Sequence, residues 1–92
     1  MLHLEKKHHA IIHNILSKYP YTFYAFGSRV KGNHHRLSDL DLCFKDPIPY
    51  SIISHLEEDF EESDLPYKVD IVNWQTCSEE FRSIISKNLL AM

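Results

Sequence analysis

The run from Asp39 to Phe44 constrains the fold of this chain more than any other segment. Asp39 and Asp41 stand two residues apart in it, and the other positions are apolar. Two residues is the period of a β-strand, so both carboxylates are expected to leave the same face. Asp46 and Pro47, which come after Lys45, end the run. The segment therefore predicts a strand that presents two acids side by side.

A second feature, Gly27-Ser28, is separated from Asp39 by ten residues. It follows an aromatic, strand-like segment at 21–26 and precedes a short predicted helix at 29–31. Glycine lets a backbone turn pass close to a phosphate, and serine offers a hydroxyl and an N–H at a helix start. Mg²⁺ prefers one or two carboxylates and fills its other positions with water and phosphate oxygens. The two features together indicate phosphoryl or nucleotidyl transfer.

Helical and strand patterns alternate along the rest of the chain. Apolar spacing predicts helices at about 3–18 and 50–62, and a last helix that runs to about 89. Thr76 followed three residues later by Glu79 resembles a capping box that opens this last helix. Strands are predicted at about 21–26, 39–44 and 67–72. Helices and three short strands predict an α/β or α+β domain with helices against a small sheet, whose strand order stays open.

Composition limits the classes of protein to which the chain can belong. Its 92 residues with 43% hydrophobic content predict a single domain, 1–92. A net charge of −3 gives no basic field, so nucleic acid is not the expected partner. Cys43 and Cys77 lack the spacing of a disulfide framework, which is typical of a reducing cytoplasm. No stretch approaches the ~18 apolar residues of a membrane span, so a soluble cytoplasmic protein is expected.

A third acid, Asp70, lies in the last predicted strand between Val69 and Ile71. Nucleotidyl transfer needs an attacking oxygen, an α-phosphate and a pyrophosphate leaving group held in line, with metal ions stabilising the charge. Asp39 and Asp41 would hold the metals. If the strand of Asp70 lies beside theirs, its carboxylate could join the second metal and take the proton from the attacking hydroxyl. The sequence thus predicts a site of three acids.

Three segments, at 26–32, 37–42 and 69–72, together resemble the minimal nucleotidyltransferase family of the DNA polymerase beta-like superfamily. The pattern is Gly-Ser, a spacer of about this length, Asp-x-Asp, and a later Asp in an apolar strand. The resemblance implies a small mixed sheet flanked by helices, ATP as donor and two Mg²⁺ ions as cofactors. It implies catalytic and metal-binding roles for Asp39, Asp41 and Asp70 and nucleotide contacts for Gly27, Ser28 and Arg29. Ser38 is expected to brace the loop that leads to the metals.

Members of this family that are as short as this chain commonly pair with a small all-helical HEPN-domain protein, and some are antitoxins that adenylylate that partner. The resemblance therefore implies transfer of AMP from ATP to a hydroxyl of a partner protein in a toxin-antitoxin pair. One alternative is transfer to a small molecule, although such enzymes usually carry a second domain. Another is a non-catalytic antitoxin that neutralises its partner by covering its surface. A second copy of the chain could also complete the acceptor site.

Two segments depart from the family pattern. His34, His35 and Arg36 fill a loop that in relatives more often carries small, acidic or proline residues. After the last predicted helix, residues 87–92 are expected to lack the short further strand that many relatives have. These departures bear on how an acceptor is recognised and on how the rim of the site is built.

Several other features suggest function but favour a structural reading. His9 and His13 stand four apart on a predicted helix, yet neither cysteine has a companion at zinc-site spacing, so solvated histidines are expected. The acidic run at 57–62 predicts the solvated face of a helix, with docking of a basic partner as the alternative. Trp74 is expected to pack at the end of a strand rather than to stack on a base.

Overall fold

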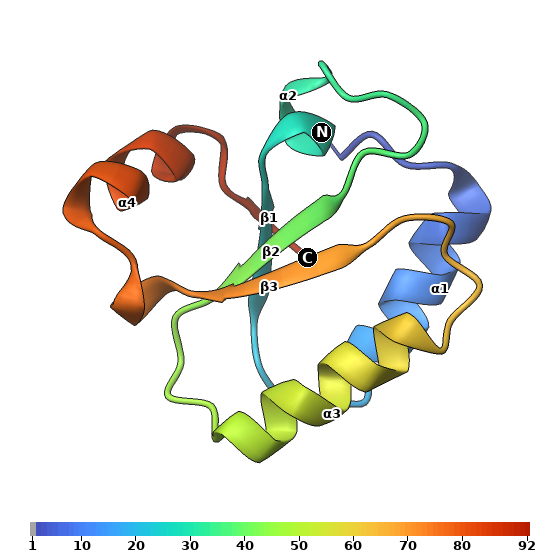
Figure 1. Ribbon diagram of the computed structural model, residues 1–92, viewed down its shortest axis with the longest axis horizontal. Coiled ribbons are helices and arrows are strands. Elements are labelled where there is room, and N and C mark those ends of the chain that lie inside the picture. Colours follow the sequence, from blue (N-terminus) through green and yellow to red (C-terminus); the bar gives the residue numbers. More distant parts are fainter. Residues whose placement is uncertain (1) are drawn as a thin grey trace.

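The computed structural model describes residues 2–92, and Figure 1 shows a four-stranded sheet with helices on both faces. In chain order the elements are α1 (Lys6–Leu16), β1 (Phe23–Phe26), α2 (Ser28–Lys31), β2 (Leu40–Phe44), α3 (Tyr50–Glu61), β3 (Val69–Asn73), the 3₁₀ turn η1 (Trp74–Thr76), α4 (Glu79–Ile85), the 3₁₀ turn η2 (Ser86–Asn88) and β4 (Leu90–Ala91). The strand order is β3-β2-β1-β4. β2 pairs with β3 in parallel, whereas β1 pairs with β2 and with β4 antiparallel. The expected mixed sheet flanked by helices is confirmed.

The alternation along β2 divides the sheet into two unlike faces. Leu40 and Leu42 are fully buried in the main core, where Ile12 of α1 and Leu56 of α3 pack against the sheet. On the other face Cys43 packs with Phe26, with Ile85 of α4 and with other apolar residues. Figure 1 shows that α4 covers only the end of this face at which β3 finishes. The opposite end of that face, where Asp41 lies, is left without a helix over it.

A fourth strand follows the last helix, so the expectation that residues 87–92 lack one is wrong. Leu90 pairs with Ala25, and the N–H of Met92 donates to the carbonyl of Phe23 at 2.9 Å. A strand of two residues carries no periodicity, and only the edge of β1 defines it. The number of strands is therefore set by a long-range pairing that local sequence does not reveal.

The last helix begins later than predicted, and Thr76 is not its cap. Thr76 lies in η1, where its hydroxyl donates to the carbonyl of Asn73 at 3.0 Å. Ser78 is the N-cap, and its hydroxyl oxygen accepts from the N–H of Phe81 at 3.2 Å. The Asn73 side chain accepts from the N–H of Gln75, so the chain turns directly after β3. This local turn occupies residues that the capping-box pattern had assigned to the helix start.

The first helix is also shorter than the predicted span of 3–18. The N–H of His3 donates to the carbonyl of Arg29 at 2.8 Å, which holds the leading segment in an extended path beside α2. α1 therefore starts at Lys6 and ends at Leu16. None of the helices within residues 2–92 combines the length and the apolar character that crossing a lipid bilayer requires.

Candidate nucleotidyl-transfer site

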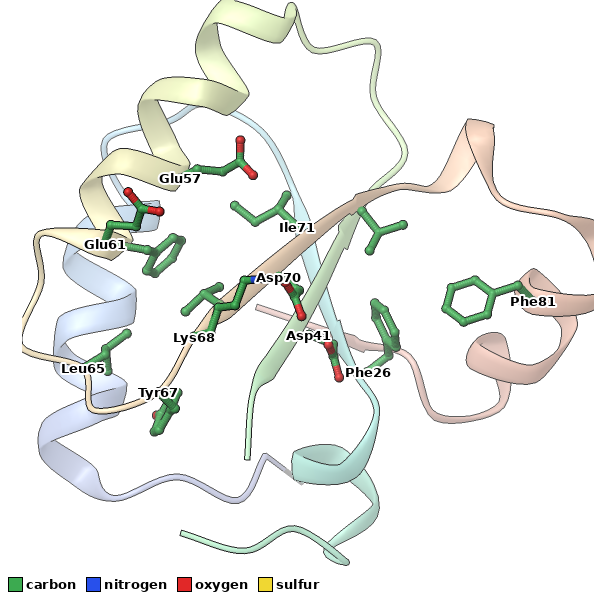
Figure 2. Close-up of a pocket in the computed structure, with 13 residues that line it drawn as sticks. Phe26, Asp41, Glu57, Glu61, Leu65, Tyr67, Lys68, Asp70, Ile71 and Phe81 are labelled. Atoms are coloured by element: carbon green, nitrogen blue, oxygen red, sulfur yellow. Dashed lines mark ion pairs between the residues drawn. The ribbon is translucent and has the colours of Figure 1, made fainter. Parts of the chain in front are cut away.

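The strand order brings Asp41 and Asp70 side by side. β2 and β3 run parallel, and the two aspartates are Cα partners in the ladder. Paired residues in neighbouring strands project to the same face, so both carboxylates leave the sheet on the side away from α1 and α3. Asp39 is exposed and lies one residue before β2 begins. In Figure 2 the carboxylates of Asp41 and Asp70 lie close together at the centre of the open face.

Gly27 lies directly against one of these acids, Asp41. Its φ of 84° belongs to the region that favours glycine, and it forms the turn between β1 and α2. A Cβ at this position would be only 2.5 Å from Oδ2 of Asp41. The absence of a side chain therefore lets the backbone approach the carboxylate. Ser28 follows as the first residue of α2 and is half-buried.

The electrostatics of the site favour a bound cation. Burial raises the pKa of Asp41 to about 6, and the negative charges of Asp70 and Asp39 add to the effect. Carboxylate oxygens are the ligands that Mg²⁺ prefers, so the donor set fits this ion. Among residues 2–92 no three His, Cys, Asp or Glu side chains converge closely enough to hold a metal by themselves.

A lysine partly compensates this negative charge. Nζ of Lys68 lies 3.2 Å from Oδ1 of Asp70, and this hydrogen bond and charge raise the pKa of Lys68. The lysine side chain is largely exposed, so the pair is accessible to solvent. Sequence reasoning missed this contact, although Lys68 stands two residues before Asp70. Residues at this spacing on a strand share a face, which is the signal that could have found it.

Arg29 does not project from the turn as a free phosphate ligand. Its side chain is buried, and its guanidinium donates to the carbonyl oxygens of Ser38 (2.9 Å), Arg36 (3.0 Å) and His3 (3.2 Å). The same group stacks on the ring of Tyr67, 3.9 Å from its centroid. These three contacts give Arg29 a positioning role, and the triphosphate contact expected from the sequence remains a prediction. Arg29 ties the loop before Asp39 to α2 and to the leading segment.

Ser38 braces the same loop, as the sequence predicted. Its hydroxyl oxygen accepts from the N–H of His35 at 2.9 Å, and its N–H donates to the carbonyl of His35 at 3.0 Å. These two contacts close the loop immediately before Asp39. The position of the first acid thus depends on Ser38 and Arg29 together.

Comparison with known proteins assigns this arrangement to a family. Residues 9–90 match the family described as Polymerase beta, Nucleotidyltransferase. The chain belongs to this nucleotidyltransferase family. It is also 44% identical over 90 residues to a probable protein adenylyltransferase, MntA, of Haemophilus influenzae, covering 94% of this chain and 79% of that protein. The minimal-nucleotidyltransferase resemblance read from the sequence is thereby confirmed.

Two solved structures share the fold of this nucleotidyltransferase. A crystal structure of a toxin-antitoxin with AMP-PNP has a TM-score of 0.67 and 23% identity, and covers 89% of this chain and 69% of that chain. A crystal structure of a mutant of the toxin-antitoxin MntA-HpeT has a TM-score of 0.63 and 20% identity, with 97% and 72% coverage. At these identities the likeness shows that the fold is the same.

An open cleft of about 570 Å³ extends from the acids of the nucleotidyltransferase site over the length of β3. Its lining residues are Phe26, Asp41, Glu57, Phe60, Glu61, Leu65, Tyr67, Lys68, Val69, Asp70, Ile71, Val72 and Phe81. Phe81 lies edge-on to Phe26, with 5.9 Å between ring centroids, and forms the wall beside the carboxylates. Sequence reasoning placed Phe81 on the apolar stripe of the last helix, and no spacing signal showed that it remains partly exposed. Trp74 packs in the cluster beneath α4, as expected.

Proposed function

We propose that this protein is a Mg²⁺-dependent nucleotidyltransferase that moves AMP from ATP onto a hydroxyl group of a partner protein and releases pyrophosphate. The observation that carries the proposal is the placement of Asp41 beside Asp70, with the side-chain-free backbone of Gly27 against Asp41. The family membership supports the reaction class, and the name of the similar Haemophilus influenzae protein supports a protein acceptor.

The residues have distinct roles in this proposal. Asp39, Asp41 and Asp70 hold two Mg²⁺ ions, which when bound neutralise the charge that develops on the phosphate oxygens. Gly27 allows the triphosphate to come close to the acids, and Ser28 donates its hydroxyl and N–H to a phosphate oxygen. The acceptor oxygen attacks the α-phosphorus while the bond to the pyrophosphate oxygen breaks. Asp70 takes the proton that the acceptor hydroxyl releases.

The partner in this proposal is a small helical HEPN-domain toxin, and this chain is the antitoxin of the pair in the cytoplasm. The two solved structures with the same fold are toxin-antitoxin structures, and one of them contains AMP-PNP, an ATP analogue. Covalent modification of the toxin would then be the protective act. The acceptor is a tyrosine or serine hydroxyl of the toxin.

An intact-mass assay tests the reaction. The purified protein is incubated with Mg²⁺ and each of the four nucleoside triphosphates, with and without the product of the adjacent gene. We expect the partner to gain the mass of one or more AMP groups with ATP only. The double variant Asp39→Asn, Asp41→Asn should give no increment. If the wild-type protein adds no mass to either chain under any condition, the proposed transferase activity is wrong.

A non-catalytic antitoxin is the second candidate, and one observation favours it. The ammonium of Lys68 already compensates the negative charge of Asp70. This acid therefore has a partner for its charge without a bound metal ion. In this case the protein would neutralise its partner by binding alone. The Asp39→Asn, Asp41→Asn variant separates the candidates, because it should lose neutralisation but keep complex formation if catalysis protects. Full neutralisation by this variant would favour the binding module.

A further inference from the structure

The outer edge of β3 is a strand edge with unpaired backbone groups. β3 stands at the end of the sheet, and β2 is its one neighbour among the described strands. The carbonyl of Lys68 accepts from the N–H of Leu40 at 2.9 Å, so the backbone of Lys68 faces β2. Successive residues of a strand point their peptide groups in opposite directions. The N–H and C=O groups of Val69 and Ile71 therefore face away from the sheet.

This edge runs along the same cleft that contains the acids. The cleft is lined by six consecutive residues, Tyr67 to Val72, together with Asp41. All of these positions except the exposed Lys68 are partly buried. A chain laid along the edge of β3 would thus lie next to the strand that carries Asp70, with Asp41 one strand further in. Strand edges of this kind are the surfaces on which extended peptides add as a further strand.

The wall of the cleft beyond this edge is acidic. Glu57 and Glu61 of α3 line it, and in Figure 2 both carboxylates project from the helix toward β3. Both residues are exposed. Lys68, which also lines the cleft, is paired with Asp70, so its charge is already matched within the site. The free charge offered to an incoming chain is therefore negative.

We propose that the edge of β3 docks an extended, basic segment of the acceptor protein as an added strand. Side chains of a strand alternate between faces, and Asp70 lies on the open face while Val69 and Ile71 pack on the core side with α3. An added strand shares this alternation. A hydroxyl-bearing residue would project on the open face beside Asp70, toward the carboxylate pair, while its two neighbours, lysine or arginine, would face Glu57 and Glu61.

In this proposal, the part that rests on the proposed function is that the docked segment carries the hydroxyl that accepts AMP. Docking itself needs no nucleotide and no metal, so it is measured separately from transfer. The probe is a fluorescein-labelled peptide of alternating lysine and serine residues, and a peptide with glutamate in place of lysine is its comparison. Fluorescence anisotropy in the absence of ATP reports binding. We expect the lysine peptide to bind, with an affinity that falls as salt is added, and the glutamate peptide not to bind.

A matched pair of double variants tests the position of the contact. Glu57→Lys with Glu61→Lys reverses the charges of the two glutamates that line the cleft. Glu58→Lys with Glu62→Lys makes the same change in net charge at exposed residues that do not line it. We expect the first variant to lose affinity for the lysine peptide by about tenfold or more, and the second by less than about twofold. Equal losses in both variants would overturn the proposal, because only net charge would then matter.

Backbone pairing is tested by amide hydrogen exchange. The peptide should slow exchange of the Val69 and Ile71 amides and leave the exposed amides elsewhere on β3 and α3 unchanged. Ile71→Pro removes one of these donors without touching the ladder to β2, and it should weaken binding if the variant folds. If the peptide binds without protecting these two amides, the added-strand geometry is wrong.

The remaining outcomes also decide the matter. If the protein self-associates through β3 and Ile71→Pro abolishes this association, the edge belongs to a second copy and the proposal fails. If the lysine peptide docks as described but no acceptor gains AMP, the docking stands and the proposed function fails. If the partner gains AMP equally with the Glu57→Lys, Glu61→Lys variant, the proposed function stands and the docking surface is wrong.

Discussion

At the scale of the residue, the site depends on the contact between Gly27 and Asp41. The turn after β1 has a positive φ, and its glycine lies where any side chain would meet the carboxylate. Asp41 is also the acid whose pKa is raised most clearly by its surroundings. Both properties arise because Asp41 of β2 pairs with Phe26 of β1, the residue before Gly27, and with Asp70 of β3. Substitutions at these two positions should therefore separate effects on stability from effects on chemistry.

Gly27→Ala should damage both stability and transfer. The new Cβ would stand 2.5 Å from Oδ2 of Asp41 at a φ of 84°, so the turn or the carboxylate has to move. We expect a loss of about 1–3 kcal/mol in the free energy of unfolding and a loss of transfer activity. Urea denaturation and the intact-mass assay measure the two effects. Gly32→Ala is the matched control, since its Cβ would meet the His3 ring at 3.1 Å, and it should lose stability but keep activity.

Asp41→Asn should stabilise the metal-free protein at neutral pH. The pKa of Asp41 is raised from 3.8 to about 6 in the folded state, so its favourable contribution to stability is present below about pH 4 and is lost as pH rises through 6. Asparagine removes this dependence. The carboxylate is partly exposed and screened, so we expect a gain below about 1 kcal/mol.

Thermal unfolding in EDTA between pH 4 and pH 8 measures this effect. The melting temperatures of wild type and Asp41→Asn should converge at pH 4 and separate by a few degrees above pH 6. Asp46→Asn, an exposed aspartate outside the cleft, serves as the control. A wild-type protein that gains stability over the variant as pH rises would contradict the assignment.

At the scale of the element, the loop between α2 and β2 is braced internally by Ser38 and held to the neighbouring segments by the Arg29 side chain. Arg29 donates to carbonyl groups at both ends of residues 36–38 and to the leading segment at His3. The loop carries Asp39 at its end and has no regular secondary structure of its own between Gly32 and Leu40. Its conformation is therefore set by contacts with a neighbouring element rather than by local propensity.

Arg29→Lys should release this loop. A lysine presents its donors from one nitrogen, whereas the three carbonyls are bound by three different nitrogens of the planar guanidinium, so lysine cannot reach all of them. We expect a loss of about 2 kcal/mol or more in stability and faster amide exchange at residues 35–39. Arg82→Lys is the matched control. Like Arg29, Arg82 donates to backbone carbonyl oxygens, those of Trp74 and Gln75, but it lies at the other end of the sheet. It should lose stability without changing exchange in this loop.

At the scale of the whole molecule, β4 completes the sheet on the side opposite the cleft. It covers the outer edge of β1 and adds Leu90 to the main core. With β4 in place, β1 is flanked on both sides and the edge of β3 next to the acids stays open. The molecule thus has one strand edge that leads to its site.

Leu90→Asp should destabilise the whole fold. The side chain of Leu90 packs on the core, so a carboxylate there would be partly buried without a partner. We expect a loss of about 2–4 kcal/mol in the free energy of unfolding, measured by urea denaturation. Ala91→Asp changes the exposed residue of the same strand and should cost less than about 1 kcal/mol. Equal costs at the two positions would mean that β4 does not pack as described.

Much of this protein could be predicted from local sequence. The three longer strands, the four helices and the Gly27-Ser28 turn follow from periodicity and turn chemistry, which act over a few residues. The candidate acids Asp39, Asp41 and Asp70 were named from their places in these strands. The family resemblance rested on the same short segments, and the comparisons confirm it. Their roles in binding metal remain proposals.

The sequence by itself therefore determined the family, the main helices and strands, and the three acids proposed to carry the chemistry. Only the tertiary structure decided that β3 lies parallel beside β2, which places Asp70 next to Asp41. It also decided that Leu90 and Ala91 form a strand and that Arg29 supports a loop. The physical reason is that strand order, edge pairing and buried hydrogen bonds join residues far apart in the chain. Their free energy depends on packing across the sheet, which no local period encodes.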